Sequence, residues 1–365
     1  MNAIKPAAFP WFEYARYTFS LGLESAGRVW LSGHSASEYD AGEERIVVKG
    51  GMEQQARTAY AKIAAILEAA GLTLGDATRV VEYVTATGIE HYAEAEAVRS
   101  ELFGAAQPAV CTVVVNSLLR PAAFIEIEVT AGGADDGIVY LPSITAPEAG
   151  DDLIAQTEAV FDKAARMLAD AGLDMSNIVK TVDYTTPRTL SDYKRTGRVR
   201  KDRLGPVYPA AAGILMSRLQ TPGTLVSLDI TASRHPLEAV NPGWERYAKL
   251  TYSPAVKAGG MLFMSGQAAL DPATEHAVFP GDVAAQAEYT YQNIIEVLKA
   301  AGAGPENLVK TIEYVTPAGL KRYREVAAVR EKLLKEPYPA STGCICQQLL
   351  RPEFEIEIDP LALLP

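Results

Sequence analysis

The sequence has few cysteines and histidines and no excess of positive charge. Its 365 residues include three cysteines, four histidines, and 34 basic against 45 acidic side chains, giving a formal net charge of −11. Nucleic-acid binding needs a concentrated basic face, so this charge argues against that class of partner. The cysteines Cys111, Cys344 and Cys346 are too few for a disulfide framework and favour a reducing compartment. We interpret Cys344 and Cys346 as small core residues on one strand face.

Long apolar runs and cofactor motifs are also missing. No stretch approaches the roughly 20 apolar residues of a membrane helix, and residues 1–12 show no secretory signal pattern. The sequence contains no Walker loop, no G-x-G-x-x-G after a strand, no H-E-x-x-H and no G-x-S-x-G. We therefore expect a cytoplasmic protein that binds a small-molecule substrate, without nucleic acid, membrane, cofactor or metal.

The sequence contains three similar copies of one segment. The copies read VVEYVTATGIEHYAEAEAVRSELFGAAQPAV from Val80, TVDYTTPRTLSDYKRTGRVRKDRLGPVYPAA from Thr181 and TIEYVTPAGLKRYREVAAVREKLLKEPYPAS from Thr311. A shift of 101 residues carries the first copy onto the second, and a shift of 231 carries it onto the third. We therefore divide the chain into three units, 1–134, 135–236 and 237–365.

The sequence of each unit predicts the same order of helices and strands. In the first, apolar residues at helical spacing run from Ala56 to Ala70 and end at Gly71, where glycine tolerates the left-handed conformation. The helix is followed by a strand, a second helix and two further strands, over Arg79–Thr85, 92–102, Val110–Val115 and Ala123–Thr130.

The three units differ at their beginnings. Extended segments at Tyr17–Ser35 and Thr251–Ala268 predict strand hairpins that turn at Ala26-Gly27 and Gly259-Gly260. The middle unit has only Gly137–Ile144 before its first helix, so we expect its first hairpin to be truncated.

The order of these motifs resembles the Rid (YjgF/YER057c/UK114) family over nearly all of the chain. In the third unit the resemblance is carried by YSPAVKAGGMLFMSGQAALDP, NLVKTIEYVT, YPAST and FEIEID. It implies an α+β, chorismate-mutase-like fold, in which a mixed sheet carries two helices on one face. Family members are usually homotrimers, so three tandem units imply a pseudo-trimer within one chain. The other face of each sheet would be buried against a neighbouring unit.

The resemblance also implies clefts between units that bind small carbonyl or imine compounds. The family arginine that grips a substrate carboxylate follows the Pro-Ala pair, a position held here by Val110, Ala211 and Ser341. An arginine clamp is bidentate and charge-assisted, and none of these residues replaces it. The remaining candidates for substrate binding are the backbone amides of Val110 and Ser341, and the cations Arg120 and Arg351.

The candidate catalytic residues follow from the same resemblance. The family glutamate that positions water or moves protons corresponds to Glu126, Ser227 and Glu357, and the family tyrosine to Phe19 and Tyr252. His34 lies at the end of a strand that lines the cleft in this family. Each candidate has a structural alternative: a solvent-facing glutamate, a tyrosine at a sheet edge, a polar residue at a strand end, or a solvated loop arginine.

These residues lead to two functional hypotheses. The first is a cofactor-free enzyme, a hydrolase or deaminase of imine or enamine type, or a lyase. Glu357 and Glu126 would transfer protons or position water in an inter-unit cleft, with Tyr252 and His34 as accessory hydrogen-bond donors. The alternative is a non-catalytic ligand-binding or scaffold protein that has lost the substrate-binding arginine. Any assembly beyond the pseudo-trimer is left open.

Overall fold

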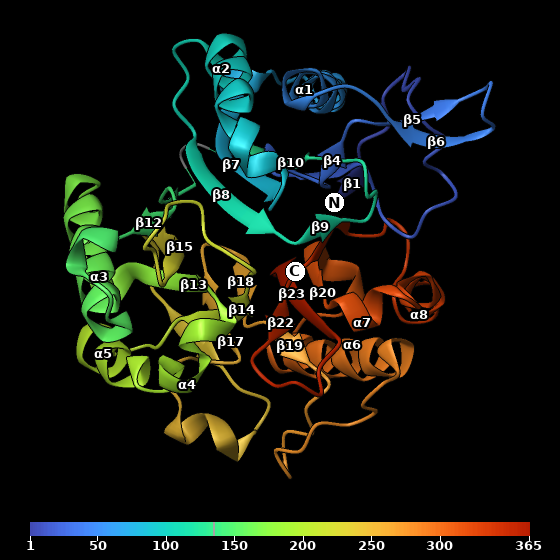
Figure 1. The fold of residues 1–365 in the computed structure, drawn as a ribbon. Coiled ribbons are helices and arrows are strands. Elements are labelled where there is room, and N and C mark those ends of the chain that lie inside the picture. Colours follow the sequence, from blue (N-terminus) through green and yellow to red (C-terminus); the bar gives the residue numbers. More distant parts are fainter. Residues whose placement is uncertain (134–135) are drawn as a thin grey trace.

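Three β-sheets surround a common axis in the computed structural model, which describes residues 1–133 and 136–365 (Figure 1). The helices lie at the periphery, and each sheet turns its other face toward the centre. The α+β fold with three tandem units is thus confirmed. The predicted boundary between residues 134 and 135 lies outside the described residues. The boundary at 236/237 stays a prediction and lies in the loop between Ser233 and Glu238.

The first sheet is built mainly from unit 1. Its strand order is β1 (Asn2–Ala3), β2 (Gly22–Ser25), β3 (Arg28–Leu31), β10 (Ile125–Gly132), β7 (Ala77–Thr85) and β8 (Ala109–Val115), with β4 (His34–Ser35) beside β10. The same unit contains the separate hairpin of β5 (Ser37–Asp40) and β6 (Arg45–Val48), and the helices α1 (Met52–Ala69) and α2 (Tyr92–Phe103).

The second sheet is built mainly from unit 2. Its order is β11 (Ile138–Tyr140), β15 (Ser227–Ser233), β13 (Ile178–Thr185), β14 (Ala210–Leu215) and β22 (Gln348–Leu349), with β12 (Ile144–Thr145) beside β15. Its helices are α3 (Leu153–Asp170), α4 (Leu190–Tyr193) and α5 (Thr196–Arg203). The single strand β11 stands where the other sheets have a hairpin, and the assignment of residues 135–236 as a unit with a truncated first hairpin stays a prediction.

The third sheet is built mainly from unit 3. Its order is β16 (Glu238–Val240), β17 (Ala255–Ala258), β18 (Met261–Met264), β23 (Ile356–Leu363), β20 (Leu308–Val315), β21 (Ala340–Ile345) and β9 (Ser117–Leu118), with β19 (Gln267–Ala268) beside β23. Its helices are α6 (Val283–Ala300), α7 (Pro317–Leu320) and α8 (Val326–Leu333). Short 3₁₀ turns complete the units: η1 (Leu74–Asp76), η2 (Gly88–His91), η3 (Pro147–Ala149), η4 (Met175–Asn177), η5 (Pro187–Thr189), η6 (Glu245–Lys249), η7 (Pro305–Asn307) and η8 (Tyr323–Glu325).

Several predicted local features are confirmed. The hairpins β2–β3 and β17–β18 turn at Ala26-Gly27 and Gly259-Gly260, as predicted. All four turn residues have positive φ angles; three of them are glycines, and Ala26 has φ +50°. The first helix of unit 1 ends before Gly71, which has φ +74°. Within each unit one strand pair is parallel, for example β7 with β8, and the remaining pairs are antiparallel.

Two strands cross from one unit to the next. The short strand β9 of unit 1 pairs with β21 of unit 3, and β22 of unit 3 pairs with β14 of unit 2. The register places Leu118 opposite Cys344 and Leu349 opposite Ile214. Unit 1 thereby extends the sheet of unit 3, and unit 3 extends that of unit 2, so these neighbours are joined by backbone hydrogen bonds as well as by packing.

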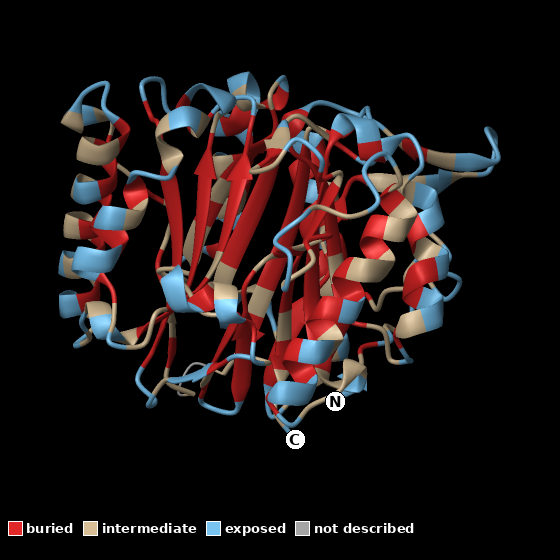
Figure 2. Ribbon diagram, turned by 90° about the horizontal axis from the view of Figure 1, so that it is seen from below, coloured by how far each residue is buried: buried red, intermediate tan, exposed pale blue. Residues whose placement is uncertain are grey.

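Most residues of the central strands are buried on both faces, as the mainly red sheets in Figure 2 show. Along β7, Val80 and Val84 belong to the apolar core under the helices of unit 1, while Val81 and Tyr83 belong to a core shared by all three units. This alternation follows from the two-residue period of a strand. Cys111, Cys344 and Cys346 lie in the shared core, as small buried residues.

Under the helices, each unit buries one carboxylate with an arginine and tyrosines. In unit 1, Glu82 accepts hydrogen bonds from Tyr60 (2.6 Å), Tyr92 and Arg99. The equivalent pairs are Arg200 with Asp183 and Arg330 with Glu313. The carboxylate partner of each of these helix arginines lies on a strand of its own unit.

At the centre, three ion pairs join the units in a ring. Arg79 of unit 1 pairs with Asp229 of unit 2, Lys180 of unit 2 with Asp359 of unit 3, and Lys310 of unit 3 with Glu128 of unit 1, the last at 2.7 Å. The three cations occupy equivalent positions of the repeat, as do the three carboxylates. The six side chains line a central cavity of about 70 Å³.

Breaking one pair of the ring should destabilise the whole chain. Lys180→Met leaves the buried Asp359 carboxylate without its cation, which we expect to cost about 3–5 kcal/mol of unfolding free energy. The double variant Lys180→Met, Asp359→Asn should recover most of this loss, as measured by urea unfolding. Equal stability of the single variant and the wild type would contradict a structural role for the ring.

One substitution should stabilise unit 2. Phe161 stands where the other units have Tyr60 and Tyr291, and the Asp183 Oδ1 atom has no hydrogen-bond partner among the described residues. Phe161→Tyr supplies the missing hydroxyl, and we expect a gain of about 1 kcal/mol. Thermal unfolding of this variant beside the reverse change, Tyr291→Phe, gives the test. A loss of stability in Phe161→Tyr would show that the hydroxyl does not reach the carboxylate.

Candidate active site at the inter-unit clefts

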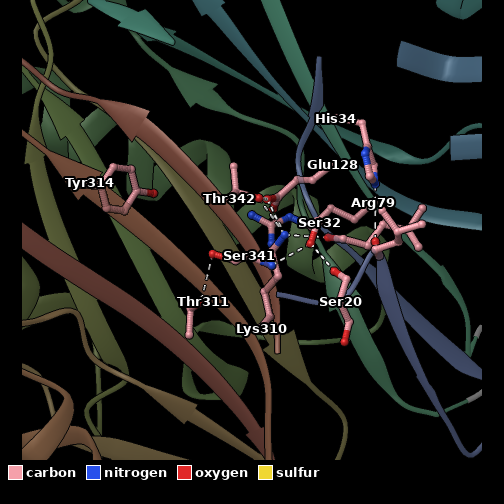
Figure 3. Close-up of polar contacts among 12 residues, drawn as sticks. Ser20, Ser32, His34, Arg79, Glu128, Lys310, Thr311, Tyr314, Ser341 and Thr342 are labelled. Atoms are coloured by element: carbon pink, nitrogen blue, oxygen red, sulfur yellow. Dashed lines mark hydrogen bonds and ion pairs between the residues drawn. The ribbon is translucent and has the colours of Figure 1, made fainter. Parts of the chain in front are cut away.

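Two of the three unit interfaces are built alike. In the cleft between units 1 and 3 (the 1/3 cleft), Ser32 Oγ accepts a hydrogen bond from the Ser341 amide (2.8 Å), and the Gly33 amide donates to the Ser341 carbonyl (3.2 Å). In the cleft between units 3 and 2 (the 3/2 cleft), Ser265 Oγ accepts from the Ala211 amide (2.8 Å), and Gly266 donates to its carbonyl (3.0 Å). Figure 3 shows the first of these contacts around Ser32 and Ser341.

The third interface, between units 2 and 1, is different. Because unit 2 has no complete first hairpin, its segment around Ser143 takes that place. Ser143 donates its amide to the Val110 carbonyl (3.2 Å) and accepts from the Thr112 amide at its Oγ (3.1 Å). The glutamate position holds Ser227. This interface therefore offers no carboxylate at the equivalent site.

The two retained clefts each bury one glutamate on the central face of a sheet. Glu126 of β10 lies opposite Ser35 of β4, and Glu357 of β23 lies opposite Ala268 of β19. Any side chain at Gly33 or Gly266 would clash with the carboxylate beside it. A side chain at either position would therefore displace the glutamate carboxylate, which lies close to the backbone here.

Neither carboxyl group is paired with a hydrogen-bond donor of the described residues. Among residues 1–133 and 136–365, no group donates one to Glu126 or Glu357, although their exposed fractions are only 9% and 7%. Burial raises the pKa of Glu126 to about 7, with Lys310 opposing the shift and Glu128 adding to it. Burial also raises the pKa of Glu357 to about 8, with the nearby Asp359 carboxylate adding to the shift. Both groups can hold or release a proton near neutral pH.

His34 does not lie with Glu126. In the register of β4 and β10 it is opposite Ile127, whose side chain belongs to the core under the helices, so it faces the other side of the sheet. Its Nε2 lies 3.4 Å from the Leu21 carbonyl oxygen (Figure 3). Burial, helped by the Lys62 cation, lowers the pKa of His34 to about 3, so the ring is neutral at physiological pH.

Tyr252 lies at the mouth of the 3/2 cleft. Its ring meets that of Tyr247 edge-on at 5.5 Å, and both line a cavity of about 360 Å³. The corresponding residue of the 1/3 cleft, Phe19, lines a cavity of about 600 Å³ and stacks on Tyr17 at 5.3 Å. Burial raises the pKa of Tyr252, so its hydroxyl remains a hydrogen-bond donor at neutral pH.

The four predicted substrate-binding residues lie in different surroundings. The Ser341 amide already donates to Ser32, and the Val110 carbonyl accepts from Ser143, so both take part in the unit interfaces. Arg120 is exposed. Arg351 donates to the Glu275 carbonyl (2.7 Å) and is one of the cations that lower the pKa of Tyr252. Of the four positions, only Arg351 places a cation close to a cleft tyrosine.

The sequence analysis did not identify two basic residues that lie near the clefts, Lys62 and Arg246. Lys62 of α1 is fully buried and donates to the Ser35 carbonyl (2.7 Å), and burial lowers its pKa to about 7. Arg246 of η6 lies beside Tyr247, with its guanidinium carbon 5.2 Å from the ring centre. A weak signal for Arg246 exists: residues 244–252 repeat residues 11–19, but with a shift of 233 instead of 231. Trp11, Tyr14, Ala15 and Thr18 match Trp244, Tyr247, Ala248 and Thr251.

The described residues contain no group of three or more histidine, cysteine, aspartate or glutamate side chains arranged to hold a metal ion. Nor does any helix among them combine the length and apolarity needed to cross a bilayer. What each retained cleft offers chemically is a buried, titratable carboxyl group and, at its mouth, an aromatic cavity whose lining does not include that carboxyl group.

Comparison with solved structures supports the architecture. A chorismatase crystal structure matches over 79% of this chain and 93% of its own, with a TM-score of 0.53 and 16% sequence identity. At this identity the match shows the fold alone. It extends across most of the three-unit assembly.

Comparison with curated proteins and family models shows which proteins the sequence resembles. A RutC family protein of Synechocystis is 34% identical over 114 residues, which are 31% of this chain and 86% of that protein. Reactive Intermediate Deaminase A of Arabidopsis thaliana, a chloroplastic protein, is 32% identical over 148 residues, or 40% of this chain and 78% of that protein. The family model described as Endoribonuclease L-PSP matches residues 13–132 and 245–364. The chain belongs to this endoribonuclease L-PSP family, the family also called Rid or YjgF, and carries its unit in tandem.

Proposed function

We propose that the protein is a cofactor-free enzyme that acts on a small carbonyl, imine or enol-ether compound by carboxylate acid/base catalysis in its inter-unit clefts. The observation that carries the proposal is the pair of buried carboxylates, Glu126 and Glu357. Each lies at an interface between units and receives no hydrogen bond from the described residues. A structural carboxylate in this fold looks different: Glu82 and Glu313 are saturated by arginine and tyrosine donors.

The raised pKa values fit the proposed chemistry. With a pKa of about 8, Glu357 is mostly protonated at neutral pH and can donate a proton to an imine nitrogen or an ether oxygen. The resulting carboxylate can then take a proton from water as the water adds to the carbon. For an imine this gives a carbinolamine and regenerates the protonated Glu357. A second proton transfer from Glu357 to the amine nitrogen, with return of the hydroxyl proton to the carboxylate, breaks the C–N bond and releases the carbonyl compound and ammonia. A relative named Reactive Intermediate Deaminase A agrees with this class of reaction.

The 3/2 cleft has the more complete set of groups. It retains both Glu357 and the hydroxyl of Tyr252, whereas the 1/3 cleft pairs Glu126 with Phe19. The neutral Tyr252 can donate a hydrogen bond to a substrate oxygen. We therefore assign the main activity to the 3/2 cleft and a lesser one to the 1/3 cleft.

One observation favours a non-catalytic alternative. The position that follows the Pro-Ala pair holds Val110, Ala211 and Ser341 in place of the family arginine, and the Ser341 amide is used by Ser32. A chain that had lost its substrate clamp could still bind ligands in its aromatic cavities. The two functions differ in what replacement of the buried carboxylates does to turnover.

Turnover should depend on Glu357. A panel of imines generated in situ and of enol ethers, followed by release of ammonia or carbonyl product, identifies the substrate. With the substrate identified in this way, Glu357→Gln should lower kcat by about 100-fold or more, because an amide cannot transfer the proton. Glu126→Gln should remove a smaller part of the activity, and the exposed Glu353→Gln should change nothing. Full activity in the Glu357→Gln, Glu126→Gln double variant would contradict the proposed mechanism and favour the ligand-binding alternative.

The same substitution should change how stability depends on pH. Between about pH 4.5 and 8 the folded chain keeps a proton on Glu357 that the unfolded chain releases, so the wild type loses stability as the pH rises through this window. Glu357→Gln removes this loss. Its stability relative to the wild type should increase from pH 4.5 to 8, by on the order of a few kcal/mol. Urea unfolding at several pH values, with Glu353→Gln as control, measures it. A constant difference would show that Glu357 is ionised in the folded state.

A further inference from the structure

The two retained clefts differ at one buried position of the strand that follows the Pro-Ala pair. The repeat aligns Ala212 of β14 with Thr342 of β21. Both strands pair in parallel with a strand that carries a cation of the ring, and the register places Ala212 opposite Val182 and Thr342 opposite Ile312. Because the register is the same, Thr342 shows which groups a side chain at position 212 faces.

In the 1/3 cleft, the hydroxyl group of Thr342 completes the hydrogen bonding of the ring cation Lys310. The Lys310 ammonium group donates to the Leu31 carbonyl oxygen (2.6 Å) and to Thr342 Oγ1 (2.8 Å). Its third partner is the Glu128 carboxylate (2.7 Å), to which Thr342 also donates, as Figure 3 shows. An ammonium group has three N–H donors, so each donor of Lys310 has an acceptor.

In the 3/2 cleft, the equivalent cation Lys180 has one acceptor fewer. Its ammonium group donates to the Met264 carbonyl oxygen and to the Asp359 carboxylate. Ala212 has no hydroxyl group, and none of residues 1–133 and 136–365 provides a third acceptor. Because the Lys180 side chain is only 11% exposed, bulk water does not freely replace that acceptor. One N–H donor of a buried cation is therefore available to a ligand.

Thr342 also lies against the glutamate of its own cleft. A Cβ atom placed on Gly33 would meet the Glu126 carboxylate and, at 2.8 Å, the methyl carbon of Thr342. The methyl group and the carboxylate therefore flank the same point of the backbone, while the hydroxyl group faces Lys310. The side chain of Thr342 thus occupies the region between the ring cation and the buried glutamate of the 1/3 cleft.

In the 3/2 cleft, Ala212 places fewer atoms in this region. A Cβ atom on Gly266 would meet the Glu357 carboxylate and, at 3.0 Å, the methyl carbon of Ala212, beyond which that side chain has no atoms. Burial raises the pKa of Glu357 and Lys180 opposes the shift, so the cation acts on this carboxyl group. Lys180 and Glu357 can therefore bind one small polar molecule together.

We propose that Lys180 and Glu357 together hold the water molecule that adds to the substrate in the 3/2 cleft, in the region that Thr342 fills in the 1/3 cleft. Lys180 donates its third N–H to the water oxygen and stays protonated. After Glu357 has protonated the substrate, its carboxylate accepts one proton of the water while the oxygen forms the bond to the substrate carbon. The proposal rests on the catalytic function of Glu357, and it adds the group that positions the nucleophile and the residue that decides which cleft can use it.

Exchange of the two residues tests the proposal, with each cleft measured alone on the substrate that the panel identifies. In Glu126→Gln protein, which retains the 3/2 cleft, Ala212→Thr should lower kcat by about 100-fold and leave KM nearly unchanged, because the water and not the substrate loses its place. In Glu357→Gln protein, which retains the 1/3 cleft, Thr342→Ala should raise kcat at least about fivefold.

Stability measurements distinguish this effect from misfolding. Ala212→Thr should unfold at the same or a higher temperature than the wild type, because its hydroxyl group accepts the spare N–H of Lys180. The matched control Ala212→Val fills the same volume without an acceptor, so it should lose as much turnover and unfold at a lower temperature than Ala212→Thr. If Ala212→Thr does not fold, Thr342→Ala decides, because that change only removes atoms.

A crystal structure of the substrate-free protein gives a readout that does not depend on turnover. The wild type should hold a water molecule within hydrogen-bond distance of both Lys180 Nζ and the Glu357 carboxyl group, and Ala212→Thr should not. Absence of this water from the wild type, or an unchanged kcat in either exchange variant, would overturn the proposal. The water in the wild type alone, together with full turnover in Glu357→Gln, would reject the catalytic mechanism and keep the water site.

Discussion

The ring of three ion pairs between units is the constraint on which the rest of the structure depends. Arg79, Lys180 and Lys310 each meet a carboxylate of a different unit, so the ring closes only when all three units are in place. Buried ion pairs contribute little net stability, but leaving one partner alone is costly. The ring therefore fixes which unit lies beside which, and the apolar layers on both sides of it supply the free energy of association.

Fixing the order of the units also fixes which side chains share a cleft. Glu126 meets unit 3 and Glu357 meets unit 2, since each hairpin can contact only the Pro-Ala strand of the next unit in the ring. In a homotrimer a substitution changes all three clefts together. In a single chain each cleft has its own residues, and this chain shows three outcomes: a buried glutamate with Tyr252 at the cleft mouth, a buried glutamate with Phe19 there, and an interface with Ser227 at the glutamate position.

Much of the fold could be predicted from the sequence because the shifts of 101 and 231 are constant through the helices and strands of each unit. The glycines that end helices and turn hairpins added local bounds. The ion-pair ring could not be predicted, since its partners lie 150 and 179 residues apart in two of the pairs and no local pattern links them. The partners of the helix arginines Arg99, Arg200 and Arg330 could not be predicted for a related reason: periodicity shows the face of a helix but not which strand lies under it.

The candidate site was predictable only in part. Glu126 and Glu357 were identified through the family resemblance. The face on which His34 lies could not be predicted, because Gly33 interrupts the strand between β3 and the two-residue β4. Arg246 was hidden by a length difference: unit 1 has two more residues between its hairpin and first helix, in the region of β5 and β6, so the shift upstream of that region changes to 233. A fixed register therefore misses this segment.

The strands that cross between units have a consequence for how such a chain can be divided. β9 completes the sheet of unit 3 and β22 that of unit 2, so a cut between units leaves unpaired strand edges on both products. A single excised unit would have to find two other copies to cover its edges and its central face. The linkers between units thus serve as tethers that keep the neighbours at high effective concentration, and severing them converts an intramolecular fold into an assembly that depends on protein concentration.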